Sequence, residues 1–543
     1  MLVRALTMVV AASPVVVAVA AGCADIDCVH AGTCIDGANA DGGPDGTVDG
    51  SGPDTPTGTD GRIDALPDVP PADGLPDVPG CDVTKSPKDD PCVISEQLGV
   101  FVDGALGADT NAGTKTAPHK TIGKAVTSAN GKRIYICANS TYAEKISLAA
   151  ANDGVQLYGG FSDCTAWTHS SAKKALIKPA SGVALEAKNL STGALFEDVA
   201  FESADAVGAD SSSIAVFVSG AQNMVFRRTT MKAGTGQAGA DGAAIADYGA
   251  RAADGNPGTA GNGGAQQAPG ACTNGSGTSI GGPGGGPAGP GQDGAGGSPT
   301  ILPVNPSGHD GAKGITGSGC AQGLGHDGTY GHGGPGGGGA STYGTLNASG
   351  WTPSDGQPGT RGDVGQGGGG GASQDNSGGG GGGGAGGCGG TGGNAGKGGG
   401  SSIALLVFNS AVMLEGVTLT ASNAGKGGNG GTGQKAQSGG IGGVQFPGEC
   451  GGGQGGHGGS GGGGGGGAGG LSVGIAWTGT APKIDGTDVP NASTLTGITL
   501  GTPGAGGALG AGGPPARPTA PVSNPGTTGT AGKDGVANAV LGL

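Results

Sequence analysis

Three oxygen-bearing side chains lie close together in the sequence: Asp103, Asp109 and Asn111. Carboxylate and amide oxygens are ligands that Ca²⁺ prefers, so this group predicts a calcium site as one interpretation. The alternative is structural, because Asp and Asn side chains also satisfy the backbone groups of tight turns. The sequence favours the turn, keeps calcium as the second interpretation, and predicts no other cofactor.

Basic residues on short apolar segments are the available proton acceptors for a catalytic site. No acidic cluster is spaced beside them in the sequence, and Arg227 and Arg228, adjacent on one strand, are expected on opposite faces. Metalloprotease and phosphate-loop motifs are absent from the sequence. We therefore predict no catalytic residues. The bases considered are Lys145, Lys178, Arg227, Arg228 and Lys232, and the histidines His309, His326, His332 and His457 are expected to be solvated loop residues rather than metal ligands.

The N-terminus predicts export. A short basic start is followed by an Ala/Val-rich run, too short to span a membrane, and then by Ala21-Gly22-Cys23. This pattern resembles a bacterial lipobox, which implies removal of residues 1–22 and diacylation of Cys23. Ala24 after the cysteine favours the outer membrane. The alternative is an ordinary signal peptide with a chance cysteine.

Export predicts that the cysteines form disulfides. The chain has 11 cysteines, and removal of Cys23 from that set leaves an even number, which suits disulfides in an oxidising compartment. Zinc is the alternative, but a CxxC pair is missing. The pairs expected from proximity or order alone are Cys28–Cys34, Cys81–Cys92, Cys137–Cys164, Cys272–Cys320 and Cys388–Cys450.

Charge and composition exclude one class of partner and define a tether. The net charge of −15 argues against nucleic acid, because phosphate binding needs a basic surface.

Residues 24–80 carry a recurrent Asp among Gly and Pro, with few large apolar residues, and so cannot bury enough surface to fold. We expect an extended spacer; a calcium-binding array is the alternative.

The segment after the tether carries a recognisable pattern. A strand around Val100–Val102 precedes a G-x-D-x-N-x-G-T turn at Gly107–Thr114, followed by P-x-x-T-I-x-x-A at Pro118–Ala125. This pattern is similar to the N-terminal signature of parallel β-helix proteins of the pectin-lyase-like type. The resemblance implies a right-handed parallel β-helix whose open end is covered by a short helix at Thr121–Ser128.

An internal repeat supports this fold. A six-residue segment, apolar or β-branched at positions one, four and six, recurs at Phe196–Phe201, Phe226–Met231, Leu414–Leu419 and Leu495–Leu500. A second strand precedes three of the copies, at Ile214–Val218, Ile403–Val407 and Val473–Trp477. A glycine-rich tract follows copies two, three and four. We therefore expect glycine-rich insertions at one corner of an all-β solenoid.

Glycine accounts for 135 of 543 residues and forms pure runs at Gly367–Gly371, Gly378–Gly384 and Gly461–Gly467. Because glycine loses the most backbone entropy on ordering, the leading expectation is flexible or irregular loops. Packed polyglycine II helices are the second interpretation. A collagen helix is the third, but the register of one Gly in three residues is broken.

The predicted organisation has eight parts. They are the signal peptide 1–22, the tether 23–80, the cap and β-helix 81–232, the insertion 233–400, a coil 401–423, a second insertion 424–470, the last strands 471–500 and a Gly/Pro-rich tail 501–543. The whole resembles glycine-rich surface lipoproteins of delta-type bacteria, a likeness that brings no assigned activity.

The expected role is a non-enzymatic surface, adhesion or glycan-binding protein, anchored in the cell envelope through lipid. Its partners would be the membrane and an extracellular polysaccharide or another cell surface. β-Helix polysaccharide lyases use calcium-binding carboxylates with a basic residue, so a carbohydrate-active lyase or hydrolase is the main alternative. A structural coat protein is the second.

Overall fold

The computed structural model describes residues 78–267, 270–287, 294–299, 310–317, 319–489, 492–517 and 524–543. The predicted signal peptide and nearly all of the tether, with Cys23, Cys28 and Cys34, lie outside the described residues, as does His309. Within the described part, no helix has the length and apolar character needed to cross a membrane.

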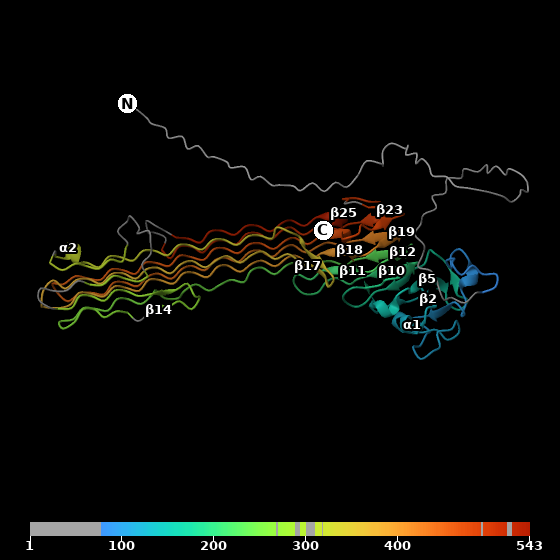
Figure 1. Ribbon diagram of the computed structural model, residues 1–543, viewed down its shortest axis with the longest axis horizontal. Helices are drawn as coiled ribbons and strands as arrows, with labels where there is room; N and C mark the ends of the chain where they lie inside the picture. The colour runs from blue at the N-terminus through green and yellow to red at the C-terminus, as the bar shows by residue number, and fades with distance from the viewer. Residues whose placement is uncertain are drawn as a thin grey trace, which may run out of the picture. The chain divides into compact units, whose positions relative to one another are not determined.

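The chain forms a parallel β-helix with three sheets, as the sequence predicts (Figure 1). From the second coil onward, each coil contributes one short strand to each sheet, so most neighbours in a sheet come from successive coils. The first sheet, sheet A, runs in the order β1 (Gly99–Val102), β2 (Arg133–Cys137), β5 (Gln156–Asp163), β9 (Ala194–Glu197), β12 (Met224–Arg227), β19 (Val412–Glu415), β22 (Lys483–Ile484) and β23 (Thr487–Asp488), with β6 (Thr168–His169) beside β5.

The other two sheets repeat this order along the solenoid. Sheet B contains β3 (Thr141–Tyr142), β7 (Ala175–Ile177), β10 (Val199–Glu202), β13 (Thr230–Lys232), β20 (Thr418–Thr420) and β24 (Ile498–Thr499). Sheet C contains β4 (Ile146–Leu148), β8 (Leu185–Lys188), β11 (Ser213–Ser219), β18 (Ser402–Phe408), β21 (Ser472–Thr478) and β25 (Ala537–Gly542).

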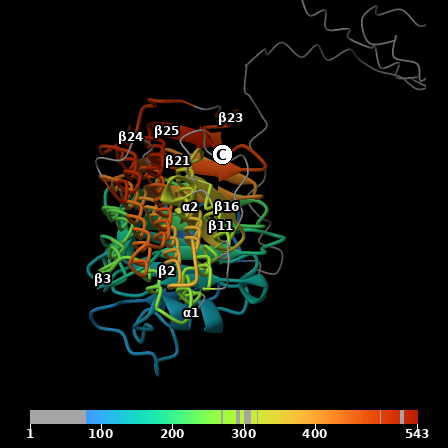
Figure 2. The ribbon, with the colours of Figure 1, turned by 90° about the vertical axis from the view of Figure 1, so that its left-hand side faces the viewer.

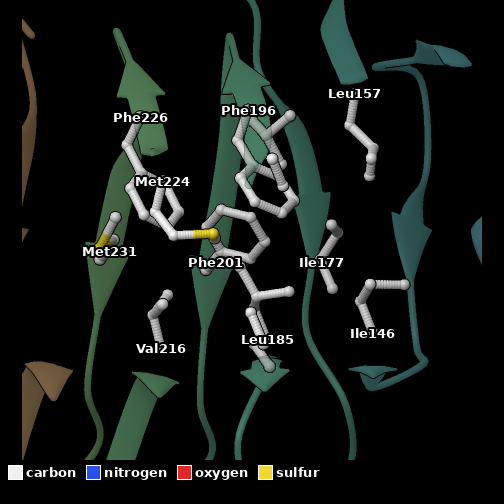
Figure 3. Packing of buried hydrophobic residues seen from close by; sticks show 14 of the residues in the cluster. Ile146, Leu157, Ile177, Leu185, Phe196, Phe201, Val216, Met224, Phe226 and Met231 are labelled. Atoms are coloured by element: carbon white, nitrogen blue, oxygen red, sulfur yellow. The ribbon is translucent and has the colours of Figure 1, made fainter. Parts of the chain in front are cut away.

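Inward side chains of the three sheets stack into a continuous apolar core (Figure 3). The rings of Phe196 and Phe226, on adjacent strands of sheet A, are stacked with centroids 5.1 Å apart. Phe201, from sheet B, meets Phe196 edge to face at 5.5 Å. Such aromatic pairs stabilise beyond the area that they bury. The repeated apolar positions of the sequence are therefore the rungs of the core.

The six-residue repeat is two short strands and not one, which corrects the sequence interpretation. Its third residue has a positive φ in all four copies, at Asp198 (φ 53°), Arg228 (φ 47°), Gly416 (φ 57°) and Gly497 (φ 81°). This residue turns the chain from sheet A to sheet B. In the fourth copy only the second half matches, because Leu414 pairs with Ile484 and not with Leu495.

Separate segments cover the ends and outer faces of the β-helix. Helix α1 (Ile122–Ser128) covers the N-terminal end, and the Thr121 side chain caps it by accepting from the Lys124 amide. Residues 78–98, including the short helix η1 (Pro91–Val93), pack on the outer face of sheet A. Hairpin β16–β17 (Gly344–Asn347 and Gly350–Pro353) packs on the outer face of sheet C through residues including Trp351.

The glycine-rich insertions leave at the corner between sheets B and C, as expected. In early coils this corner is short, as between β10 and β11. After β13, β20 and β24 it expands into residues 234–400, 424–470 and 503–535, whose described parts we call the polyglycine bundle (Figure 1). Within the bundle lie hairpin β14–β15 (Gly270–Ala271 and Thr278–Ser279) and the single-turn helix α2 (Cys320–Gly323).

The bundle is ordered, so the leading expectation of flexible loops is wrong and the second interpretation holds. Backbone amides bond to neighbouring segments at every third residue, as in Gly236 to Asn423, Gly239 to Lys426 and Gly242 to Asn429. Three residues per turn without internal hydrogen bonds is the geometry of a polyproline II type helix. At about 3.1 Å per residue, segment 378–400 spans about 70 Å.

Each pure glycine run lies where a segment is surrounded on six sides. Segment 450–470 is the clearest case, because Gly461–Gly467 has hydrogen-bonded neighbours in every direction. Figure 2 views the bundle from its far end, along the direction of its segments. These neighbours are segments 323–340, 354–372, 378–400, 424–446, 504–513 and 524–535, bonded for example through Gly337–Gly463, Gly462–Thr360, Gly393–Gly462, Gly464–Gly431, Gly510–Gly464 and Gly463–Thr527.

Residues with side chains replace glycine where a segment of the bundle lacks one of its six neighbouring segments. Segments 504–513 and 524–535 bond to residues 460–470 but not to the first half of segment 450–470, and there Gln454 and His457 replace glycine. At the edge of the bundle, segment 524–535 keeps only Gly526, Gly529, Gly532 and Gly535 at every third position. Glycine density along the sequence therefore follows the number of neighbours.

The C-terminal segment differs from the predicted tail. Residues 503–513 and 524–535 belong to the bundle, and β25 returns to sheet C beside β21. Residues 492–493 then bond antiparallel to β25, through Ala492 and Val540. The tail therefore completes the last coil of the solenoid.

Candidate functional site

The predicted calcium ligands are used by the turn that precedes helix α1. Asp103 accepts from the amides of Ala105 and Leu106, at 2.9 and 3.1 Å. Asp109 accepts from the amides of Lys120 and Thr121, at 3.0 and 2.9 Å, and from the Thr121 hydroxyl. The Asn111 side chain donates to the carbonyl of Pro118 at 2.9 Å. These bonds give all three residues the structural role that the sequence favours.

Two groups of three metal-ligating side chains occur in the described part of the chain, Cys81–Asp90–Cys92 and Asp103–Cys137–Cys164. The cysteines of both groups form disulfides, Cys81–Cys92 and Cys137–Cys164, as predicted. Because a metal requires a thiolate and these sulfurs are oxidised, neither group fits a metal site.

We expect calcium to leave the stability of the protein unchanged, because the oxygens of Asp103 and Asp109 already bond to backbone amides. Thermal unfolding with added Ca²⁺ and with a chelator measures this directly. A rise in melting temperature that depends on calcium, and that is lost in Asp109→Ala, would restore the calcium interpretation.

The candidate catalytic bases are all ion-paired, although no acidic cluster is spaced beside them in the sequence. Lys145 pairs with Glu186, while Lys178 and Lys232 share Glu202, at 2.7 and 3.3 Å. Arg227 pairs with Glu415 at 2.6 Å. The partners lie on adjacent coils, so the sequence separation of 188 residues between Arg227 and Glu415 hid the pair.

Several buried and partly buried charges gather at the turn between sheets A and B. Asp198 is fully buried and accepts from His169 at 3.0 Å. Arg228 forms a bidentate pair with it, Nε to Oδ1 at 3.1 Å and Nη2 to Oδ2 at 2.8 Å, and also bonds to Glu197. Lys174 lies 3.9 Å from the same carboxylate. We call these five residues the charged cluster.

Arg228 reaches this cluster because it lies in the left-handed region, at φ 47°. The strand alternation that would separate it from Arg227 ends at that residue, and both side chains are partly buried. Burial alone would raise the pKa of Asp198, but hydrogen bonds from His169 and Arg228 hold that pKa below its ordinary value. The cluster therefore carries an ionised carboxylate in a fixed geometry.

The charged cluster has the residue types of an acid–base site, but its residues line none of the three cavities described for this structure. Three surface cavities of about 220 to 280 Å³ have other linings: one beside Met224 and Met413, one beside α1, and one beside Val207. The carboxylate and the guanidinium of the cluster bind each other. This arrangement suits an ionic clamp that holds adjacent coils together.

Asp153 supplies a measurable pH dependence. Burial opposes ionisation, but bonds from Ser191, Thr192 and Gly193 outweigh it and lower the pKa of Asp153 from 3.8 to about 2. A carboxyl whose pKa is depressed by folding contributes stability that is present above its unfolded pKa and is lost as pH falls through the folded pKa. That window runs from about pH 4 to about pH 2 for Asp153.

We therefore expect Asp153→Asn to lower stability at pH 7 and to flatten the fall in stability between pH 4 and pH 2. Thermal unfolding of both proteins from pH 2 to pH 7 gives the comparison. Asp488→Asn, at an exposed position, is the control and should keep the wild-type profile. Parallel pH profiles for Asp153→Asn and the wild type would contradict this assignment.

The described histidines of the bundle make separate contacts. His326 lies 2.8 Å from Asp310, and His332 lies 3.3 Å from Asp363. His457 accepts from the Gly439 amide at 3.0 Å, and its ring stacks on Tyr330 at 4.9 Å. His326 and His332 are exposed and His457 is partly buried. In the described part of the chain these three histidines share no group of metal-ligating side chains.

Two long-range disulfides fasten the outer half of the bundle, and their pairing corrects the expectation. Cys272 bonds to Cys388, and Cys320 bonds to Cys450, in place of Cys272–Cys320 and Cys388–Cys450. Each disulfide joins two segments that are neighbours in the bundle. The pairing therefore depends on how the segments are packed and not on the order of the cysteines in the sequence. At the end of the bundle, Glu449 accepts from the Gln374 amide and from the Ser377 hydroxyl.

Comparison with known proteins adds information on the β-helix alone. Neither the search of curated proteins nor that of solved structures finds a match. Residues 105–217 match a family described as "Protein of unknown function (DUF1565)", which is associated with parallel β-helix proteins. The match runs from the turn before α1 into β11 and ends before the polyglycine bundle. The chain is thus similar to this family over its early coils.

Proposed function

We propose that the chain is an exported, lipid-anchored cell-envelope protein with a non-enzymatic surface role in adhesion or glycan binding. In this proposal the β-helix is the base and the polyglycine bundle is a stiff arm that presents side chains. The supporting observation is the bundle, in which segments about 70 Å long are bonded to each other at every third residue. The segments of the bundle pack through their backbones, so most of their side chains lie on the outer surface.

The disulfides support export. Four disulfides occur in the described part of the chain, and two of them join residues more than 100 positions apart. Disulfides of this kind persist in oxidising compartments and are rare where thiols are kept reduced. This favours a location outside the cytoplasm, in agreement with the lipobox resemblance at Cys23.

The regular surface of the arm supports a repetitive ligand. Segment 424–446 presents Lys426, Asn429, Thr432, Lys435 and Ser438 at every third position, exposed or partly exposed. At about 3.1 Å per residue, these side chains repeat every 9 Å or so along a straight line. A row of evenly spaced hydrogen-bonding groups matches a polymer with repeating hydroxyl groups. We therefore name polysaccharide as the ligand class.

An enzyme is the second candidate, because the charged cluster holds His, Asp and Arg side chains together. The position of the cluster disfavours it, since none of its residues lines one of the three cavities described above. A structural coat protein is the third candidate and needs no ligand.

One experiment separates the three. The chain from residue 24, which lacks the lipidated cysteine, is screened against soluble polysaccharides, with binding and reducing-end release measured on the same samples. We expect binding without release, weakened in a Lys426→Ala, Thr432→Ala, Lys435→Ala variant. Release of reducing ends would overturn the non-enzymatic role, and absence of binding would favour a coat protein.

Cell fractionation of the Cys23→Ser variant tests the lipid anchor separately, and we expect this substitution to release the protein from the membrane.

A further inference from the structure

The outer face of sheet A carries a row of buried apolar side chains, and part of this row lines a groove. Leu195, Val225 and Met413 occupy consecutive register positions on β9, β12 and β19, with Lys483 next on β22. Residues 78–98 cover the start of this row, because Val78 and Val83 pack on the cluster that contains Leu195 and Val225.

A groove lies on the same face of sheet A and shares Val225 with this cluster. It has a volume of about 220 Å³, and its lining includes Val225, Ala411, Met413 and Ala481. Val225 belongs both to the covered cluster and to the groove. The groove is therefore a direct continuation of an existing contact between the N-terminal segment and the β-helix.

The sequence before Val78 repeats the motif that makes this contact. Leu75-Pro-Asp-Val78-Pro79 is preceded by an identical copy, Leu66-Pro-Asp-Val69-Pro70. Val78 of the second copy packs on the apolar cluster of sheet A. The first copy has the same two apolar side chains and two prolines, which favour an extended conformation and reduce the entropy lost on docking.

The connection between the copies is long enough. Their starts are nine residues apart, and nine residues in extended form reach at most about 30 Å. Neighbouring strands of a sheet lie about 4.8 Å apart, so a connection of this length exceeds the width of several strands of sheet A.

We propose that Leu66–Pro70 docks in the groove between Val225 and Ala481, as a second copy of the contact made by Val78. The predicted tether would then be fastened along sheet A, and its free length would end before Leu66. This shortens the spacer between the lipid anchor and the β-helix, and it fixes the site at which the spacer leaves the fold.

Photo-crosslinking of the full mature chain tests the docking. A benzophenone amino acid in place of Val69 should crosslink to the peptides that contain Met413 and Ala481, as mapped by mass spectrometry. The same probe in place of Val48, in the middle of the tether, is the matched control and should give a several-fold lower yield at these peptides.

A second variant separates loss of docking from a defect in the folding of the β-helix. Leu66→Ser lies outside the β-helix and should reduce the Val69 crosslink to the control level, with the melting temperature of the β-helix retained. Equal yields from the two probe positions, or crosslinks from position 69 that avoid the groove, would overturn the proposal.

Discussion

Gly464→Ala is expected to disrupt the polyglycine bundle and to lower the free energy of unfolding by about 3 kcal/mol, the upper end of the usual cost of overpacking. A Cβ atom at this position would overlap the backbone carbonyl oxygen of Asn394. The neighbours cannot move away, because the segment around Gly464 is bonded to others on six sides. Urea unfolding and protease cleavage within the bundle measure the effect.

Gly338→Ala is the matched control. Gly338 lies on segment 323–340 of the same bundle, is exposed, and would place its Cβ atom in open space. We expect its unfolding free energy to stay within about 0.5 kcal/mol of the wild type, as for other surface substitutions. Equal effects of the two substitutions would mean that the glycine run is not closely packed.

Asp198→Ala is expected to destabilise the β-helix by about 3–5 kcal/mol, the usual cost of removing one partner of a buried ion pair. The substitution leaves the partly buried guanidinium of Arg228 without its bidentate partner and removes the acceptor for His169. It also places Ala at φ 53°, in the left-handed region that Asp and Asn tolerate better. Asp198→Asn should therefore be less destabilising.

Glu186→Ala provides the comparison for Asp198. Glu186 also pairs with two cations, Lys145 and Lys188, but these three side chains are partly exposed. Its loss should cost about 0–1 kcal/mol, as for a surface pair, and chemical denaturation of both variants gives the difference. If the two variants were equally stable, the charged cluster would not be the clamp that the geometry indicates.

The cap and the first coils could be predicted because their signals are local. The Thr121 cap, strand β2 at Arg133–Cys137 and the apolar positions around Phe196 and Phe226 each depend on a few adjacent residues. The one-corner insertion also followed from sequence, because the glycine tracts begin at the same place in the repeat. Sequence missed the turn inside the repeat, since Arg228 is an unusual residue for the left-handed region.

The order of the bundle could not be predicted from composition. Glycine has no side chain, so the apolar periodicities that reveal helices and strands are absent, and its entropy favours disorder. A usable signal was nevertheless present in the edge segments, where Gly526, Gly529, Gly532 and Gly535 repeat with a period of three. A pure run such as Gly461–Gly467 then marks a central position and not a loop.

The long-range pairs were hidden for a related reason. Cys272 meets Cys388 and Cys320 meets Cys450 because their segments are neighbours in the bundle, at separations of 116 and 130 residues. Likewise, the partners of Arg227 and Arg228 come from other coils of the solenoid. Such contacts depend on the stacking of coils and segments, which local sequence does not encode.

Amide hydrogen exchange at Gly461–Gly467 tests the central claim most directly. In the structure these amides donate to carbonyl oxygens of surrounding segments, and all seven residues are buried. We predict that they exchange as slowly as the strands of the β-helix core, for example β18. Exchange at the rate of an unstructured glycine peptide, with β18 protected in the same sample, would contradict an ordered polyglycine bundle.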